Sequence, residues 1–191
     1  AGNETVTNPA LDRVRQEAAQ RLSLVPDNKR SFLWVTDFPL FTRESNGTLS
    51  SVHHPFTSPH PDDLGLLDSA PEKVRALAYD VVLNGLELGG GSIRINDPGM
   101  QRRVLSLLGI NDDDAEARFG FLLHALSAGA PPHGGIAFGF DRLAMVLSGA
   151  TSLRDVIAFP KTTAATALFE DAPSAIPPED LRDLHLQTMT D

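Results

Sequence analysis

Two apolar runs joined by Asn84-Gly85 constrain the fold more than any other feature of the sequence. An Asn-Gly pair between apolar runs is the strongest short-range signal for a β-hairpin, because both loop residues accept positive φ. We therefore expect two antiparallel strands with this register: Leu83 opposite Leu86, Val82 opposite Glu87 and Val81 opposite Leu88.

Two carboxylates meet on one face of this predicted hairpin. Side chains alternate along a strand, so Asp80 lies on the face of Val82, and Glu87, opposite Val82, lies there too. As diagonal neighbours, their backbones are about 7–8 Å apart. Such carboxylates repel each other unless a cation or protons intervene, and Mg²⁺ prefers oxygen ligands of this kind together with substrate phosphates. The pair indicates either a magnesium site or a hairpin whose charged face is in water.

Three consecutive glycines, residues 89–91, follow the hairpin. Glycine inside a strand often marks a β-bulge or the close approach of a ligand or another backbone. Beyond them Arg94 stands between Ile93 and Ile95, either as a surface residue or as a clamp for an anion. In an unbroken strand Glu87 and Arg94 would point to opposite faces, so if both serve one site the glycines must contain a bulge that resets the register.

Two adjacent histidines, His53 and His54, follow a predicted strand. Adjacent strand side chains point to opposite faces, so we do not expect this pair to hold one metal ion. No familiar ligand spacing links them to His60 or His133. The pattern indicates either one ligand-facing histidine beside a packed one, or two ordinary loop histidines.

A glycine-rich predicted strand over 135–139 runs directly into an apolar helix. Arg142 falls in the first turn of this helix, where a cation opposes the helix dipole. Free N–H groups in the same turn favour an anion. The arginine and the helix start together indicate a phosphate site, and the alternative is an ion pair of Arg142 with Asp141 or another acid.

The rest of the chain mixes helices with short strands. The expected elements are a helix after Asn8 with Pro9 at its first position, a buried strand over 32–35, a hairpin at Asn46-Gly47, a short helix over 71–79, and helices over 98–108, 115–128, 141–147 (closed by Gly149) and 178–184. Strands joined by hairpins and interspersed with helices predict an α+β fold, with a mainly antiparallel sheet flanked by helices.

Composition excludes several classes of function. The 191 residues include no cysteine, which rules out a disulfide framework, a thiol nucleophile and a thiolate metal site, and which is compatible with the cytoplasm. With 16 basic and 25 acidic residues the formal net charge is −9. The sequence has no basic stripe, so we expect most contacts to any nucleic acid to be made by residues outside this chain. No apolar run approaches the roughly 20 residues of a membrane span.

Several of these motifs belong to longer phrases that follow one another along the chain. They are residues 32–41 (FLWVTDFPLF), 53–57 (HHPFT), 79–95, 139–142 (GFDR) and 154–161 (RDVIAFPK). In this order they closely resemble the bacterial-type aspartyl-tRNA synthetases, which are class II aminoacyl-tRNA synthetases. The last two phrases correspond to the third signature motif of class II and its downstream flank.

The resemblance implies ATP-dependent activation of L-aspartate to aspartyl-adenylate and transfer of the aspartyl group to tRNA(Asp). It implies that His53, with His54 beside it, contacts the aspartate, and that Arg94 holds the side-chain carboxylate of this substrate. An asparagine amide accepts a bidentate guanidinium less well, which would give selectivity for aspartate.

For ATP, the resemblance implies that Asp80 and Glu87 hold Mg²⁺ with the nucleotide. It makes Glu87 and Arg142 the catalytic residues, because the reaction depends mainly on positioning and charge neutralisation, with Arg142 on the γ-phosphate. Phe140 stands where the family usually has leucine, a mild change at an apolar position. The implied ATP-binding stretch is Gly139, Phe140, Asp141 and Arg142.

The same resemblance divides the chain. Residues 1–29 are expected to be the tail of a domain inserted into the bacterial catalytic domain, with a linker helix, and residues 30–191 the C-terminal portion of that catalytic domain. The anticodon-binding barrel and signature motifs 1 and 2 are not in this sequence, and the second motif carries the arginine for the α-phosphate. We therefore expect the chain alone to be inactive, the full-length enzyme to be a homodimer, and no membrane partner.

Two other interpretations stay open from the sequence. One is a non-enzymatic accessory or binding module that resembles class II synthetases. The other is an asparaginyl-tRNA synthetase or another aspartate-using ligase. Retention of His53, Asp80, Glu87, Arg94 and Arg142 favours an enzyme over a remnant, and Arg94 favours aspartate.

Overall fold

The computed structural model describes residues 2, 4–26 and 29–189. The chain forms two compact units, Ala1–Phe138 and Gly139–Asp191. The strands are β1 (Phe32–Val35), β2 (Phe41–Arg43), β3 (Leu49–Ser51), β4 (Ala78–Leu83), β5 (Leu86–Ile93) and β6 (Gly134–Phe138). The α-helices are α1 (Glu4–Arg21), α2 (Pro98–Leu107), α3 (Asp112–Ser127), α4 (Phe140–Ser148) and α5 (Pro178–Asp183). Three short 3₁₀ helices are η1 (Pro61–Leu66), η2 (Pro71–Lys73) and η3 (Leu153–Asp155).

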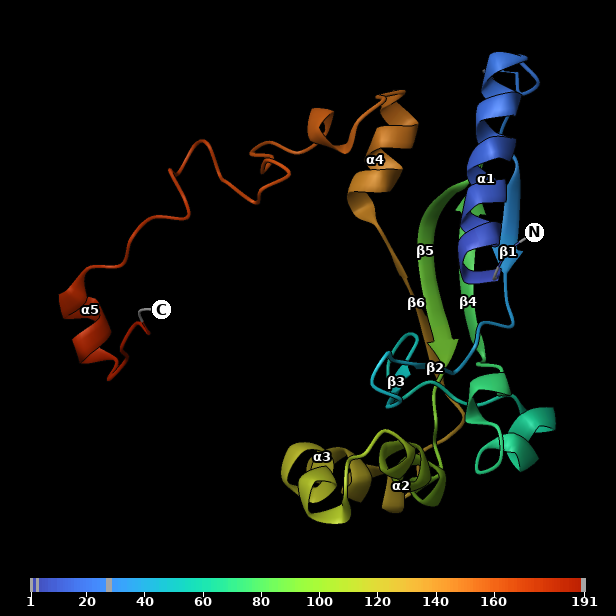
Figure 1. Ribbon diagram of the computed structural model, residues 1–191, viewed down its shortest axis with the longest axis vertical. Helices are drawn as coiled ribbons and strands as arrows, with labels where there is room; N and C mark the ends of the chain where they lie inside the picture. Colours follow the sequence, from blue (N-terminus) through green and yellow to red (C-terminus); the bar gives the residue numbers. More distant parts are fainter. Residues whose placement is uncertain (1, 3, 27–28, 190–191) are drawn as a thin grey trace. The chain divides into compact units, whose positions relative to one another are not determined.

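One antiparallel sheet organises the first unit. Its strand order is β1-β4-β5-β6, and β2 and β3 pair separately as the hairpin predicted at Asn46-Gly47. Figure 1 shows α2 and α3 beyond the end of the sheet at which β5 finishes. The predicted α+β fold with a mainly antiparallel sheet is confirmed. None of the described helices is long and apolar enough to cross a membrane.

The β4–β5 hairpin begins with the predicted loop. Asn84 (φ 50°) and Gly85 (φ 86°) both adopt positive φ, as a two-residue hairpin loop with this sequence requires. The side chain of Asn84 also accepts from the N–H of Ser31 at 2.9 Å, which ties the loop to the start of β1. The first two predicted pairs, Leu83 with Leu86 and Val82 with Glu87, are confirmed.

The third predicted pair is wrong, because the register changes at that point. Val81 pairs with Gly89 instead of Leu88, which leaves Leu88 as the extra residue of a β-bulge. The side chain of this inserted residue is buried, with only 3% of Leu88 exposed. One inserted residue moves every later side chain of β5 to the other face relative to an unbroken strand.

The three glycines after the bulge allow close approaches that a side chain would block. A Cβ on Gly89 or Gly91 would lie 2.5 Å or 1.9 Å from a backbone carbonyl oxygen of β6. A Cβ on Gly90 would lie 2.2 Å from the Oδ1 atom of Asp80. The backbone of β6 therefore requires glycine at positions 89 and 91, whereas at position 90 only the end of the Asp80 side chain would have to move.

The core lies mainly at the end of the sheet near α2. The largest cluster joins β2, the segment that leads into β4, and α2, and a second cluster joins α2 to α3. The buried side chains of the first are Leu40, Phe41, Leu67, Val74, Ala76, Ala78, Ile95 and Val104, and those of the second are Leu105, Ala115 and Leu123.

Three predicted elements differ from the structure. β1 forms as expected but is not buried: Phe32 and Trp34 are 64% and 60% exposed, because β1 is an edge strand of the sheet. The predicted helix over 71–79 is only the turn η2, since the chain from Ala78 onward pairs in the sheet. α1 begins at Glu4, so Pro9 lies inside the helix, where its missing N–H removes one backbone hydrogen bond close to the helix start.

An ion pair joins η1 to the segment that leads into β4. Arg75 donates from its Nε to Asp63 Oδ2 at 2.8 Å and from Nη2 to Oδ1 at 3.0 Å, and its backbone N–H donates to Oδ2 at 3.0 Å. Its Nη1 also lies 3.4 Å from Asp37 Oδ1. These hydrogen bonds from Arg75 lower the pKa of Asp63 from 3.8 to about 2. Folding therefore favours the ionised form of this carboxylate.

We expect Asp63→Asn to lower the free energy of unfolding at neutral pH, because an amide replaces a charged acceptor of three N–H groups. Since the folded-state pKa lies below the unfolded value, the stabilisation is present above about pH 4 and is lost as the pH falls toward about 2. Urea unfolding of wild type and variant at pH 7 and at decreasing pH checks this. A stability difference that does not shrink in acid would contradict it.

We also expect Gly91→Ala to destabilise the protein by about 1–3 kcal/mol, because the new methyl group meets rigid backbone of β6. Gly135→Ala is the matched control, since a Cβ there meets no atom within 4 Å. Its effect should stay within about 0.5 kcal/mol. Equal unfolding midpoints for the two variants in urea would show that the glycines are not required for the close approach.

Candidate active-site face

The β-bulge brings the predicted residues of β4 and β5 to one face of the sheet. Glu87 pairs with Val82, and Val82 is two residues from Asp80 on β4, so both carboxylates share a face. Beyond the bulge Asp80 pairs with Gly90, and alternation from Gly90 carries Arg94 to the same face, just past the end of β5. The register does change between Glu87 and Arg94, as a shared site would require, but the inserted residue is Leu88, just before the glycines that are predicted to contain the bulge.

Asp80 occupies an electrostatically unfavourable place on this face. Burial raises the pKa of its carboxyl group, and the negative charge of Glu87 raises it further, whereas His53 acts in the opposite direction. Asp80 therefore lies within electrostatic reach of both Glu87 and His53. Two carboxylates held together in this way favour the binding of a cation.

Arg94 lies against the imidazole of His54. Its Nη1 is 3.0 Å from His54 Nδ1 and also contacts Nε2. The backbone N–H of Phe56 donates to Nδ1 at 3.2 Å, and the hydroxyl of the buried Thr57 lies 3.4 Å from the same atom. Burial, then the charge of Arg94 and then that of His53, lowers the pKa of His54. A neutral ring therefore supports the guanidinium of Arg94, whose charge and planar donors suit a carboxylate.

His53 is exposed and packs against an aromatic ring that sequence reasoning missed. The rings of His53 and Phe38 are 4.8 Å apart between centroids and inclined at 84°. Phe38 carries no polar group, so nothing in the sequence indicates that it belongs to the site. Only its ring contact with His53 in the folded structure does. Both histidines thus have ring contacts, His53 with Phe38 and His54 with Phe56.

The predicted phosphate-binding stretch begins α4 in the second unit. Gly139 is the N-cap residue and α4 starts at Phe140, one residue earlier than predicted. Arg142 is near the start of the helix, and its Cδ lies 3.4 Å from the position of a Cβ on Gly139. No N-cap side chain bonds the N–H groups of this first turn. The arginine and these N–H groups therefore lie together, as an anion site requires, and Gly149 (φ 71°) ends the helix as predicted.

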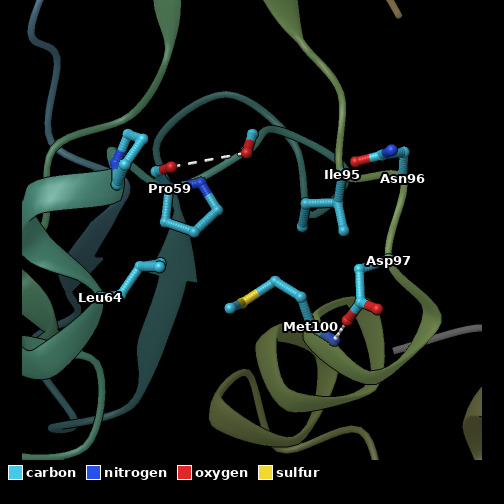
Figure 2. Close-up of a pocket in the computed structure, with 8 residues that line it drawn as sticks. Pro59, Leu64, Ile95, Asn96, Asp97 and Met100 are labelled. Atoms are coloured by element: carbon cyan, nitrogen blue, oxygen red, sulfur yellow. Dashed lines mark hydrogen bonds between the residues drawn. The ribbon is translucent and has the colours of Figure 1, made fainter. Parts of the chain in front are cut away.

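A separate pocket of about 260 Å³ lies between η1 and the start of α2. Figure 2 shows Pro59, Leu64 and Met100 directed toward one space. The polar groups at its edge serve the fold: Asp97 accepts from the N–H of Met100 at 2.6 Å, and Asn96 donates to a backbone carbonyl at 3.2 Å. None of the predicted site residues lines this pocket. Its lining residues are Ser58, Pro59, Pro61, Leu64, Ile95, Asn96, Asp97 and Met100.

Asp80 and Glu87, the predicted magnesium ligands, do not by themselves complete a metal site. Within residues 2, 4–26 and 29–189, no group of three or more His, Asp or Glu side chains is positioned to hold a metal ion. Asp80 and Glu87 supply two carboxylates. This set fits Mg²⁺, which takes one or two protein carboxylates and completes its octahedral shell with water and substrate phosphates.

We expect Asp80→Asn to raise the free energy of unfolding at neutral pH. The folded-state pKa of Asp80 lies above its ordinary value of 3.8, so ionisation disfavours the folded protein above that pKa, and the penalty disappears as the pH falls below about 4. Urea unfolding at pH 7 and in acid measures the change. Asp63→Asn should change stability with the opposite sign, and a loss of stability in Asp80→Asn at pH 7 would refute the expectation.

Comparison with known proteins identifies relatives over the whole chain. The aspartate–tRNA(Asp/Asn) ligase of Desulfatibacillum aliphaticivorans is 53% identical over 192 residues, which cover 100% of this chain and 32% of the relative. The aspartate–tRNA ligase of Macrococcus caseolyticus (strain JCSC5402) is 51% identical over 184 residues, 96% of this chain and 31% of the relative. The chain thus spans about a third of the length of the curated relatives it matches.

The fold is also found in solved structures. The aspartyl tRNA synthetase from Entamoeba histolytica superposes with a TM-score of 0.53 and 22% sequence identity, over 78% of this chain and 25% of that chain. At this identity the likeness concerns the fold alone. Residues 7–163 match the family described as tRNA synthetases class II (D, K and N). Together with the antiparallel sheet, this match shows that the chain belongs to the class II tRNA synthetases of the D, K and N family.

Proposed function

We propose that this chain is part of an aspartate–tRNA ligase, which activates L-aspartate with ATP and transfers it to tRNA(Asp). The observation that carries the proposal is the single sheet face on which the bulge gathers Asp80, Glu87 and Arg94. The curated relatives that are 53% and 51% identical to the chain support the same reaction. In this proposal the chain supplies the aspartate side and part of the ATP side of the active site.

Recognition of aspartate rests on Arg94 and the two histidines. Two parallel N–H groups of the Arg94 guanidinium can donate to both oxygens of the substrate's side-chain carboxylate, whereas an asparagine amide offers only one acceptor. His54 keeps Arg94 in place from one side through its neutral ring. His53, within electrostatic reach of Asp80, contacts the bound aspartate.

Activation joins the aspartate α-carboxylate to the α-phosphorus of ATP, and pyrophosphate leaves. Asp80 and Glu87 would hold Mg²⁺ on the nucleotide, where the ion would offset the negative charge of the phosphates. Arg142 and the N–H groups at the start of α4 receive the γ-phosphate. These residues act by positioning and by charge neutralisation, so Glu87 and Arg142 are the proposed catalytic residues.

We assign the contacts to tRNA(Asp) and the dimer contacts mainly to parts of the enzyme outside this chain. Residues 1–29 are proposed to be the tail of an inserted domain, and residues 30–191 the C-terminal portion of the catalytic domain. Because the formal net charge is −9, most contacts to tRNA(Asp) are assigned to other segments. Homodimerisation of the full-length enzyme and its cytoplasmic location belong to the same proposal.

The proposal is tested by replacing the matching third of the Desulfatibacillum aliphaticivorans relative with this chain. We expect the chimera to catalyse aspartate-dependent exchange between ATP and pyrophosphate, and the isolated chain to catalyse none. The unmodified relative is the positive control. A folded chimera without exchange would favour a non-enzymatic accessory role, and exchange by the isolated chain would refute its predicted inactivity.

Within the chimera, Arg94→Gln should lower kcat/KM for aspartate by about 10- to 150-fold, because a charged hydrogen-bond donor to the carboxylate is lost. Arg103→Gln is the matched control, since Arg103 pairs with Asp68 on the protein surface and should leave the exchange rate unchanged. Equal effects of the two substitutions would remove Arg94 from the proposed site.

A further inference from the structure

We infer that Phe38 is a positioning residue that holds the imidazole of His53 in its orientation on the active-site face. The two rings meet edge to face, with centroids 4.8 Å apart and planes at 84°. This inference rests on the proposed function, in which His53 contacts the aspartate. It adds a residue that makes no contact with substrate and acts through its neighbour.

Phe38 is anchored from three directions. Its carbonyl oxygen accepts from the N–H of Ala76 at 2.7 Å, and two residues later the N–H of Leu40 donates to the carbonyl of Val74 at 2.8 Å. Its half-buried ring packs against the core cluster that includes Leu40 and Val74. The preceding residue, Asp37, is paired with Arg75 at 3.4 Å. The backbone and ring of Phe38 are therefore held by the fold itself.

His53 needs such a support because of its place in the chain. It follows β3 in a bend and its side chain is exposed. The N–H of the preceding residue, Val52, donates to the carbonyl of Leu40 at 3.1 Å, so the bend is tied to the same segment that carries Phe38. An exposed side chain on a bend samples several rotamers unless a neighbour restricts it. Phe38 supplies that restriction.

The orientation of His53 matters because of the groups it faces. In the proposed function the imidazole of His53 faces the bound aspartate, so the plane of the ring decides whether it can make that contact. An edge-to-face contact fixes the plane of a ring as well as its distance, which a rounded aliphatic side chain does not. Loss of the aromatic ring should therefore loosen His53 while the backbone of residues 38–40 stays in place.

NMR of the chain, labelled on histidine and phenylalanine, tests the positioning directly. In wild type we expect cross-relaxation between the ring protons of Phe38 and His53, and couplings that report one side-chain rotamer for His53. Phe38→Leu should give averaged couplings, and Phe38→Tyr should restore the single rotamer. Phe119→Leu is the matched control, because Phe119 packs edge to face on Phe56 at 5.5 Å and should leave His53 unchanged.

A double-mutant cycle in the chimera tests the consequence for the reaction. Phe38→Leu should raise KM for aspartate by about two- to tenfold, the range expected for one aromatic pair, with a smaller change in kcat. In the background of His53→Ala the same substitution should have no further effect, because its effect passes through His53. Phe38→Tyr should retain the wild-type KM.

The two experiments separate this inference from the proposed function. A chimera without aspartate-dependent exchange would refute the function, and the rotamer of His53 would still decide the role of Phe38. One unchanged rotamer in Phe38→Leu would overturn the inference. Effects on KM that add in the double variant would overturn it as well, because Phe38 would then act independently of His53.

Discussion

The β-bulge at Leu88 is the constraint on which the rest of the active-site face depends. By inserting one residue opposite Val81 and Val82, it places Glu87 and Arg94 on the face of Asp80, although seven positions separate them in the chain. The glycines that follow then allow β6 and the Asp80 carboxylate to approach β5. A regular strand would leave Glu87 and Arg94 on opposite sides of the sheet.

Two aspartates of the same unit show how function and stability make opposite demands on charge. Asp63 is surrounded by donors from Arg75, and its pKa falls to about 2, so its ionisation favours folding. Asp80 is half-buried beside Glu87, and its pKa is raised, so its ionisation opposes folding. The negative charge of Glu87 beside a half-buried Asp80 lowers stability, and the same repulsion favours a cation when one is present.

Local signals predicted much of the fold and part of the site. The loops Asn84-Gly85 and Asn46-Gly47 predicted both hairpins, because positive φ is a property of those residues and needs no partner. The exposure of β1 and the reduction of the predicted helix over 71–79 to the turn η2 were not predictable in this way. Both depend on which strands are neighbours in the sheet. Pairing between distant segments produces no periodic pattern in the sequence of either segment.

The sequence by itself determined the antiparallel hairpin, the pairing of Val82 with Glu87, and the residue types that a carboxylate clamp and a phosphate site require. Only the tertiary structure decided that the inserted residue is Leu88, that His54 lies against Arg94, and that Phe38 packs on His53. The reason is the range of the forces involved. Turn and strand preferences act within a few residues, whereas ring contacts, ion pairs and register are set by segments that meet only after the chain has folded.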